Sequence, residues 1–203
     1  MRRRLADATR LVLDRLIASG APSEMLATAA ERMEAFAVTL ADYPYGRTYQ
    51  GFAEPANASQ PNAFLDNSPL SGKANPIAPP MSLEQTGDRI HGRVRFGVAY
   101  EGPPGCVHGG FVAAAHDEIL GMANSLGGIP GMTGTLTVKY LKPTPLHTDL
   151  RMEAWFDRVE GRKQWCYSQL WAGEVLCNEA EGLFVTITPQ RFKDLLDARD
   201  RQR

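Results

Sequence analysis

The sequence predicts an α+β fold, with one long helix set against a meandering antiparallel sheet and extra helices at the N-terminus. Three observations support this. Residues 108–125 form one apolar helical segment, and the chain from residue 90 onward otherwise alternates with the two-residue period of half-buried strands. Short turns also join the last three strand-like runs, and such turns produce antiparallel neighbours.

Two helical patterns make up a predicted N-terminal extension, residues 1–42. Ser23 is a good N-cap for the second helix. The apolar stripes at helical spacing are Leu5, Ala8, Val12 and Leu16 in the first, and Leu26, Ala29, Met33, Phe36 and Leu40 in the second. We expect these stripes to pack on the main body or on a partner subunit.

A proline-rich connecting segment is predicted for residues 43–80, which hold seven of the chain's fourteen prolines. Proline excludes a regular helix or a central strand, so the segment is a linker or a functional cover over a site. The main domain is then residues 81–190, and residues 191–203 form a tail or a short helix.

Five strand-like runs alternate between apolar and other residues. The first extends from Ile90 to Val98 and precedes the helical segment. The other four follow the helix, at residues 132–141, 150–158, 163–171 and 175–188, with turns at 160–162 and 172–174. Tryptophans 155, 165 and 171 are expected to pack in the core or on a sheet face.

Charge and cysteine content exclude several classes of protein. Lys plus Arg (22) nearly cancels Asp plus Glu (23), whereas a nucleic-acid binder or a binder of anionic membranes carries a basic excess. The three cysteines are an odd number without zinc spacing, which predicts reduced thiols, a cytoplasmic location and no metal. Acidic residues soon after the opening Arg run argue against a targeting peptide.

Candidate chemistry lies in the middle of the central helix, where His116, Asp117 and Glu118 are consecutive. Successive helical residues point about 100° apart, so at least one acid is expected to be partly buried in a helix this apolar. A partly buried carboxylate is a functional candidate. The alternative is a charged patch where the helix emerges between strands.

A glycine-rich turn precedes this helix, and its sequence is Gly-Pro-Pro-Gly-Cys-Val-His-Gly-Gly over residues 102–110. Glycine is a poor residue for a first helical turn, but Gly109 and Gly110 let a ligand approach unshielded N–H groups at the positive end of the helix dipole. This is the outline of an oxyanion hole. The alternative is a tight loop where another backbone passes close.

The spacing of these features predicts a homodimer. His108 and Asp117 are nine residues apart, which is about 13 Å of helix rise and a net half turn, so they point to opposite sides. They can meet if two copies of the helix lie antiparallel across a two-fold axis. Thr133, on the next strand, can bring a hydroxyl to the same place.

At these residues the sequence resembles hot-dog-fold acyl-CoA thioesterases. The phenylacetate-pathway type shares the His-Gly-Gly…Asp spacing, and members of the carboxy-terminal modulator protein type also share Gly-Pro-Pro-Gly before it. Further likeness lies in residues 140–146 (Tyr-Leu-Lys-Pro-Thr-Pro-Leu), in residues 159–163 (Val-Glu-Gly-Arg-Lys) and in Glu179-Ala180 with Leu183-Phe184-Val185. The resemblance extends over roughly residues 88–189.

The resemblance implies hydrolysis of an acyl-CoA thioester by a homodimer or a dimer of dimers, without cofactor or metal. Asp117 is then the nucleophile or the general base, the Gly109 and Gly110 amides polarise the thioester carbonyl, His108 shapes the turn, and Thr133 orients the water or Asp117. Lys139, Lys142 and Arg162 are the candidates for binding coenzyme A. Many relatives carry Asn where this chain has Gly102.

Two other functions stay open from sequence. One is a hot-dog hydratase acting on an enoyl thioester, which requires a His/carboxylate pair placed for proton transfer to carbon. The other is an acyl-CoA-binding or partner-regulating module without turnover.

Overall fold

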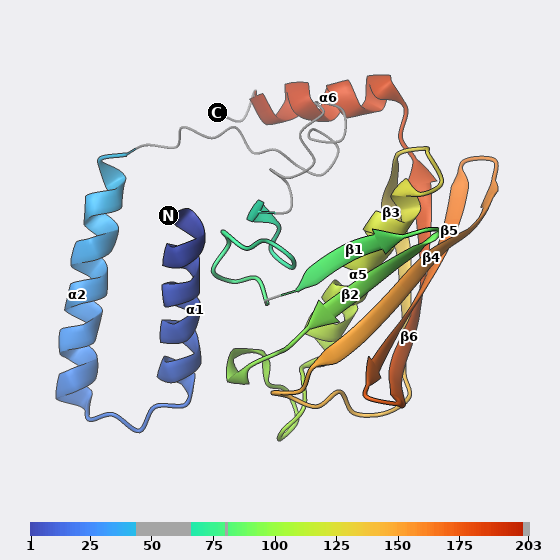
Figure 1. The fold of residues 1–203 in the computed structure, drawn as a ribbon. Coiled ribbons are helices and arrows are strands. Elements are labelled where there is room, and N and C mark those ends of the chain that lie inside the picture. The colour runs from blue at the N-terminus through green and yellow to red at the C-terminus, as the bar shows by residue number, and fades with distance from the viewer. Residues whose placement is uncertain (44–65, 80, 201–203) are drawn as a thin grey trace.

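The computed structural model describes residues 1–43, 66–79 and 81–200 (Figure 1). Helices α1 (Arg2–Ile17) and α2 (Ser23–Ala41) follow each other at the N-terminus and run in opposite directions. The main body contains β1 (Ser82–Thr86), β2 (Arg89–Val94), the 3₁₀ helix η1 (Val98–Tyr100), α5 (Gly109–Ser125), β3 (Gly131–Tyr140), β4 (Leu150–Glu160), β5 (Lys163–Ala172) and β6 (Val175–Thr186). Helix α6 (Pro189–Asp200) follows.

The six strands form one antiparallel sheet in the order β1-β2-β4-β5-β6-β3, and α5 lies along one of its faces. The predicted α+β architecture is therefore confirmed. Strand β3 comes directly after α5 in the chain but lies at the edge of the sheet, paired with β6 on one side. This position brings an edge strand beside the central helix.

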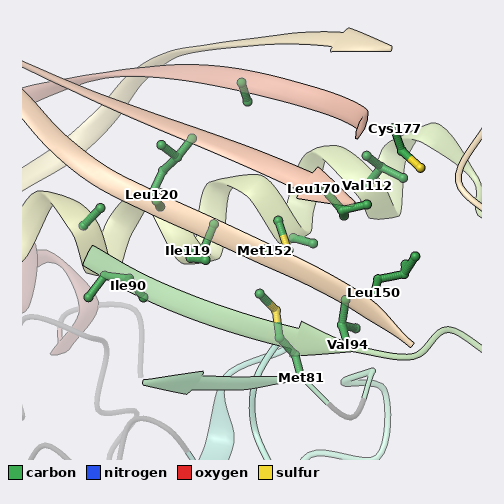
Figure 2. Close-up of a cluster of buried hydrophobic side chains, with 14 of the residues drawn as sticks. Met81, Ile90, Val94, Val112, Ile119, Leu120, Leu150, Met152, Leu170 and Cys177 are labelled. Atoms are coloured by element: carbon green, nitrogen blue, oxygen red, sulfur yellow. The ribbon is translucent and has the colours of Figure 1, made fainter. Parts of the chain in front are cut away.

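The core lies between α5 and the sheet (Figure 2). The buried stripe of α5 repeats at three- and four-residue intervals and consists of Val112, Ala115, His116, Ile119, Leu120, Ala123 and Asn124. The facing strands contribute alternate residues, among them Leu150, Met152 and Ala154 of β4. Each fully buried aliphatic side chain contributes about 1.5–3 kcal/mol of transfer free energy, which holds the helix against the sheet.

The other face of the sheet carries the tryptophans. Strand β5 turns polar Gln164 and Ser168 toward α5 and its aromatic residues outward. An arginine guanidinium covers each tryptophan ring at 4.1–4.4 Å, in the pairs Arg89–Trp155, Arg151–Trp171 and Arg158–Trp165. The expected sheet-face packing of the tryptophans is therefore confirmed.

The predicted strand over residues 90–98 is wrong at its C-terminal end. Pairing stops at Val94, and the chain turns into η1 at Val98. Strand β1 is not among the predicted strands, because Leu83 is the only large apolar side chain in its Ser-Leu-Glu-Gln-Thr sequence. An edge strand with so little burial leaves a weak periodic signal.

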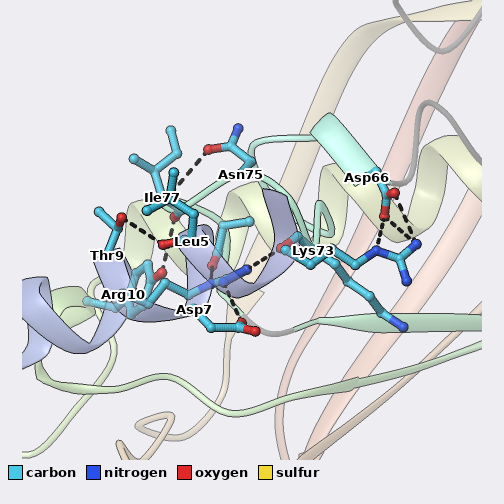
Figure 3. Close-up of polar contacts among 11 residues, drawn as sticks. Leu5, Asp7, Thr9, Arg10, Asp66, Lys73, Asn75 and Ile77 are labelled. Carbon is cyan, nitrogen blue, oxygen red and sulfur yellow. Dashed lines mark hydrogen bonds and ion pairs between the residues drawn. The ribbon is translucent and has the colours of Figure 1, made fainter. Parts of the chain in front are cut away.

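Helix α1 docks on the body through a different face from the predicted stripe. Leu5, Val12 and Leu16 are exposed, whereas Ala6 is buried. The Arg10 guanidinium donates to the carbonyl oxygens of Ala78 (3.2 Å) and Lys73 (2.9 Å), as Figure 3 shows. Polar anchors to the connecting segment therefore seat this helix, and a hydrophobic pattern does not reveal them.

Helix α2 departs from the sequence prediction at its start. Pro22 is its N-cap residue and Ser23 is already helical, so the predicted Ser23 cap is wrong. The helix buries none of its residues, and its stripe does not pack on the main body in the described part of the chain. Packing on a partner subunit stays a prediction.

The connecting segment lies partly outside the described residues, at positions 44–65 and 80. Residues 66–67 are helical and residues 68–79 form turns, with no strand, and this stretch contacts both α1 and α5. No helix among the described residues has the length and apolar character that crossing a bilayer requires.

Candidate active site

The three consecutive polar residues of α5 point in three different directions. His116 is directed into the core against β5 and β6, Asp117 lies toward the edge strand β3, and Glu118 lies toward the connecting segment. Both acids are half-buried. Each side chain has a different polar partner, so the chemistry of each is set separately.

Asp117 is paired with a hydroxyl. Thr133 Oγ1 donates to Asp117 Oδ1 at 2.9 Å. Simple alternation along β3 would put Thr133 on the same side as Thr135 and Thr137, facing away from the helix. An irregularity in the pairing with β6 between Thr133 and Thr135 shifts the register and turns Thr133 toward α5. Bulges re-aim side chains in this way.

His116 belongs to a sealed polar network. The ring is fully buried, with Nδ1 2.7 Å from Ser168 Oγ and Nε2 2.7 Å from Asn178 Oδ1. Asn178 in turn donates to Thr144 at 2.8 Å. Burial lowers the pKa of His116 to about 4, so the ring is neutral at pH 7. This histidine ties the helix to the sheet and does not reach solvent.

Glu118 anchors the connecting segment. The hydroxyls of Ser68 and Ser71 both donate to its Oε1. The sequence assigns no role to Glu118 and does not point to Ser68 or Ser71, because serines in a proline-rich segment carry no periodic signal. Two hydroxyls thus satisfy a half-buried carboxylate next to Asp117 and hold residues 66–79 against α5.

The glycine-rich turn ends in an N-cap made by His108. The His108 Nδ1 accepts a hydrogen bond from the Gly110 amide at 3.0 Å, which in a neutral ring leaves the proton on Nε2. The Gly109 amide donates to no described residue, so it is the available donor of the two predicted amides. Tyr140, which is not among the predicted site residues, donates from its hydroxyl to the Gly109 carbonyl at 2.9 Å.

Gly102 is required by close packing. A Cβ atom at this position would lie 2.7 Å from the Cα of His108. The Gly102 amide also donates to the Cys106 carbonyl at 2.9 Å, which closes the turn. This turn therefore has no room for an asparagine side chain at position 102, and any stabilisation of a bound carbonyl must come from other groups.

The predicted coenzyme A-binding residues do not gather in one place. Lys139 lies on the outward side of β3 in an ion pair with Glu179 at 3.2 Å, and Lys142 follows the C-terminal end of that strand. Arg162, in the β4–β5 turn, lines the same cleft as Thr133. The described residues include no cluster of His, Cys, Asp or Glu with metal-binding geometry.

The fold and the site together define a class of protein, in which an antiparallel sheet packs on one helix that carries a mid-helix carboxylate and a glycine-rich start. Residues 104–177 match the sequence profile of the thioesterase superfamily. A crystal structure described as a thioesterase superfamily protein is 33% identical, with a TM-score of 0.81, covering 91% of this chain and 95% of its own. The chain therefore belongs to the thioesterase superfamily, and the predicted hot-dog fold is confirmed.

Curated relatives match over a shorter stretch. Acyl-coenzyme A thioesterase THEM4 of Mus musculus is 33% identical over 97 residues, which is 47% of this chain and 42% of that protein. The THEM4 protein of Xenopus laevis is 36% identical over 93 residues, or 44% of this chain and 41% of its own. The chain thus spans less than half the length of the curated relatives it matches.

Proposed function

We propose that this protein hydrolyses acyl-CoA thioesters, with Asp117 as the catalytic carboxylate. The observation that carries the proposal is the pairing of a half-buried Asp117 with the Thr133 hydroxyl, on a helix whose Gly109 amide has no acceptor among the described residues. The relatives named acyl-coenzyme A thioesterase support the same chemistry. The Thr133 bond occupies Oδ1, and Asp117 acts through its other oxygen, either on the thioester carbon or on a water.

The amide of Gly109 is the proposed donor to the carbonyl oxygen. It lies at the start of α5, where the helix dipole favours developing negative charge. The Gly110 amide is already used by His108, and this bond keeps the turn in the shape that exposes Gly109. Tyr140 supports the turn from the other side.

The site is proposed to form between two copies of the chain. Gly109 and Asp117 are about 12 Å apart along one helix, too far to act on one thioester. Gly109 is hydrogen-bonded to Tyr140 at the C-terminal end of β3, and Asp117 is hydrogen-bonded to Thr133 near its N-terminal end. If two β3 edges pair antiparallel, Thr133 comes opposite Tyr140 of the partner subunit, and the partner's glycine turn approaches Asp117.

The character of β3 supports this pairing. It is a ten-residue strand at the edge of the sheet with Met132 and Tyr140 more than half exposed, at 54% and 56%. Long exposed edges of this kind are templates for pairing with another chain. A homodimer through β3 extends the sheet across both subunits.

A hydratase is disfavoured by the histidines. His116 is the histidine next to Asp117, but it is fully buried and both of its ring nitrogens have partners. His108 is used in the N-cap. Within one chain, therefore, neither histidine is placed for proton transfer to a substrate carbon beside Asp117.

The activity is tested by thiol release from a panel of acyl-CoAs, from acetyl to palmitoyl, with phenylacetyl and benzoyl. We expect turnover of a subset, and a loss of about 10²–10³ in kcat for Asp117→Asn at unchanged thermal stability. Near wild-type turnover by that variant would remove Asp117 from the mechanism. Acyl-CoA binding without thiol release by the wild type would favour the binding-module alternative.

The shared site is tested by mixing two inactive variants, Asp117→Asn and Gly110→Val. Valine at position 110 would displace the His108 ring, since even a Cβ there lies 3.1 Å from Nδ1. In a mixed dimer, one site combines the intact Asp117 of one chain with the intact glycine turn of the other. An equal mixture, unfolded and refolded together, should recover about 25% of wild-type activity. Half of the dimers are then mixed, and each mixed dimer has one intact site out of two. No recovery would mean that each site belongs to one chain.

A further inference from the structure

A cleft of about 710 Å³ opens where β3 starts and β6 ends. Thr133 lines it, so the residue that bonds Asp117 also forms part of its wall. Met132, Val185 and Ile187 add apolar surface. A cleft of this size accommodates a ligand of cofactor dimensions.

Two arginines are the charged side chains among the described residues that line this cleft. Arg162 comes from the β4–β5 turn, and its Nη2 lies 3.5 Å from the Thr186 carbonyl. Arg191 comes from the first turn of α6, where its amide donates to Thr188 Oγ1 at 3.3 Å. Two distant parts of the chain thus bring positive charge to one cleft that has no acid in its described lining.

The chemistry of the lining selects a phosphorylated, partly apolar ligand. Guanidinium groups bind phosphate through paired charge-assisted hydrogen bonds, and they also stack on aromatic rings. The apolar surface beside them suits a nucleobase. A short thiol without phosphate would leave the two arginines without an anionic partner.

We propose that this cleft binds the phosphorylated nucleotide end of coenzyme A, with Arg162 and Arg191 as its phosphate-binding residues. The inference rests on the proposed thioesterase function. The proposal adds Arg191, which is not among the coenzyme A-binding residues predicted from sequence. It keeps Arg162 and leaves out Lys139, whose ammonium group is paired with Glu179 on the outward side of β3.

The test compares two substrates that carry the same acyl group, an acyl-CoA and the matching acyl-pantetheine, which lacks phosphate and nucleotide. For Arg162→Ala and Arg191→Ala we expect KM for acyl-CoA to rise about tenfold each, with kcat little changed. KM for acyl-pantetheine should stay at its wild-type value. Arg93→Ala, on β2 in the other half of the sheet, removes one positive charge away from the cleft and should change neither KM.

Equal KM changes for both substrates, or none for acyl-CoA, would overturn the proposal. Failure of the thioesterase function has a different signature, which is no thiol release by the wild type from either substrate. In that case calorimetric titration with coenzyme A replaces kinetics. Wild-type binding that the Arg162→Ala/Arg191→Ala variant weakens at least tenfold would support the cleft, and unchanged binding or no wild-type binding would refute it.

Discussion

The Thr133 hydroxyl donates a hydrogen bond of 2.9 Å to Asp117 Oδ1, and this bond joins the edge strand to the central helix. It depends on a single irregularity in the pairing of β3 with β6, which turns Thr133 toward α5. The carboxylate proposed for catalysis is therefore oriented by the strand that is also proposed to form the dimer.

Removing the Thr133 hydroxyl should slow turnover without unfolding the protein. Hydrogen bonds to charged groups are worth about 1.5–3 kcal/mol, so Thr133→Val should lower kcat by about tenfold or more. Thr133→Ser keeps the hydroxyl and should retain most of the activity. Thr135→Val is the matched control on the same strand. Equal kcat values for the two valine variants would show that the bond to Asp117 does not matter.

Two glycines of α5 should respond oppositely to alanine. Gly121 has nothing within 4 Å of an added Cβ, so Gly121→Ala should stabilise the protein by about 0.5–1 kcal/mol. In Gly110→Ala, the Cβ would press on the His108 ring and disturb the cap, which offsets that gain and lowers kcat. Denaturant unfolding and thiol release measure both effects. A stabilised, fully active Gly110→Ala variant would contradict this view of the turn.

Stability should fall in acid partly because of His116. Burial lowers the pKa of His116 to about 4 from its ordinary 6.5, so between these pH values the unfolded chain binds a proton that the folded protein does not. The free energy of unfolding should therefore drop as pH falls from 6.5 to 4, by on the order of 3 kcal/mol from this residue.

The measurement is the free energy of unfolding at pH 7 and at pH 4 for wild type and for His116→Gln. The His116→Gln variant should have a lower free energy of unfolding than wild type at pH 7, but this free energy should fall less between pH 7 and pH 4. Ser168→Ala keeps the imidazole and serves as the control. Its free energy of unfolding should still fall between pH 7 and pH 4. A His116→Gln variant that loses as much as the wild type would exclude His116 as the cause.

The anchor between the connecting segment and α5 should be measurable by a double-mutant cycle. Removing the hydroxyls in Ser68→Ala/Ser71→Ala leaves the half-buried Glu118 carboxylate without these donors, which should cost about 1–3 kcal/mol. In a Glu118→Gln background the same two substitutions should cost less. Identical costs in both backgrounds would mean that the serines act independently of Glu118.

The central helix, most of the strands and the candidate carboxylate could be identified from sequence because their signals are local. The apolar segment at 108–125 and the two-residue alternation after residue 130 arise from burial on one face, and Asp117 stands out as an acid within an apolar helix. Strand β1, with one large apolar residue, and the polar docking of α1 through Arg10 leave no comparable pattern.

The sequence by itself determined the α+β class, the glycine-rich helix start and the choice of Asp117. Only the tertiary structure decided where neighbouring side chains point: Thr133 toward the helix, His116 into the core, and Glu118 onto Ser68 and Ser71. It also brought Arg191 to the cleft that Thr133 lines. The reason is that a strand's side chains alternate with a period of two, so one irregular residue reverses the face, and that contacts between distant segments depend on packing that no local pattern encodes.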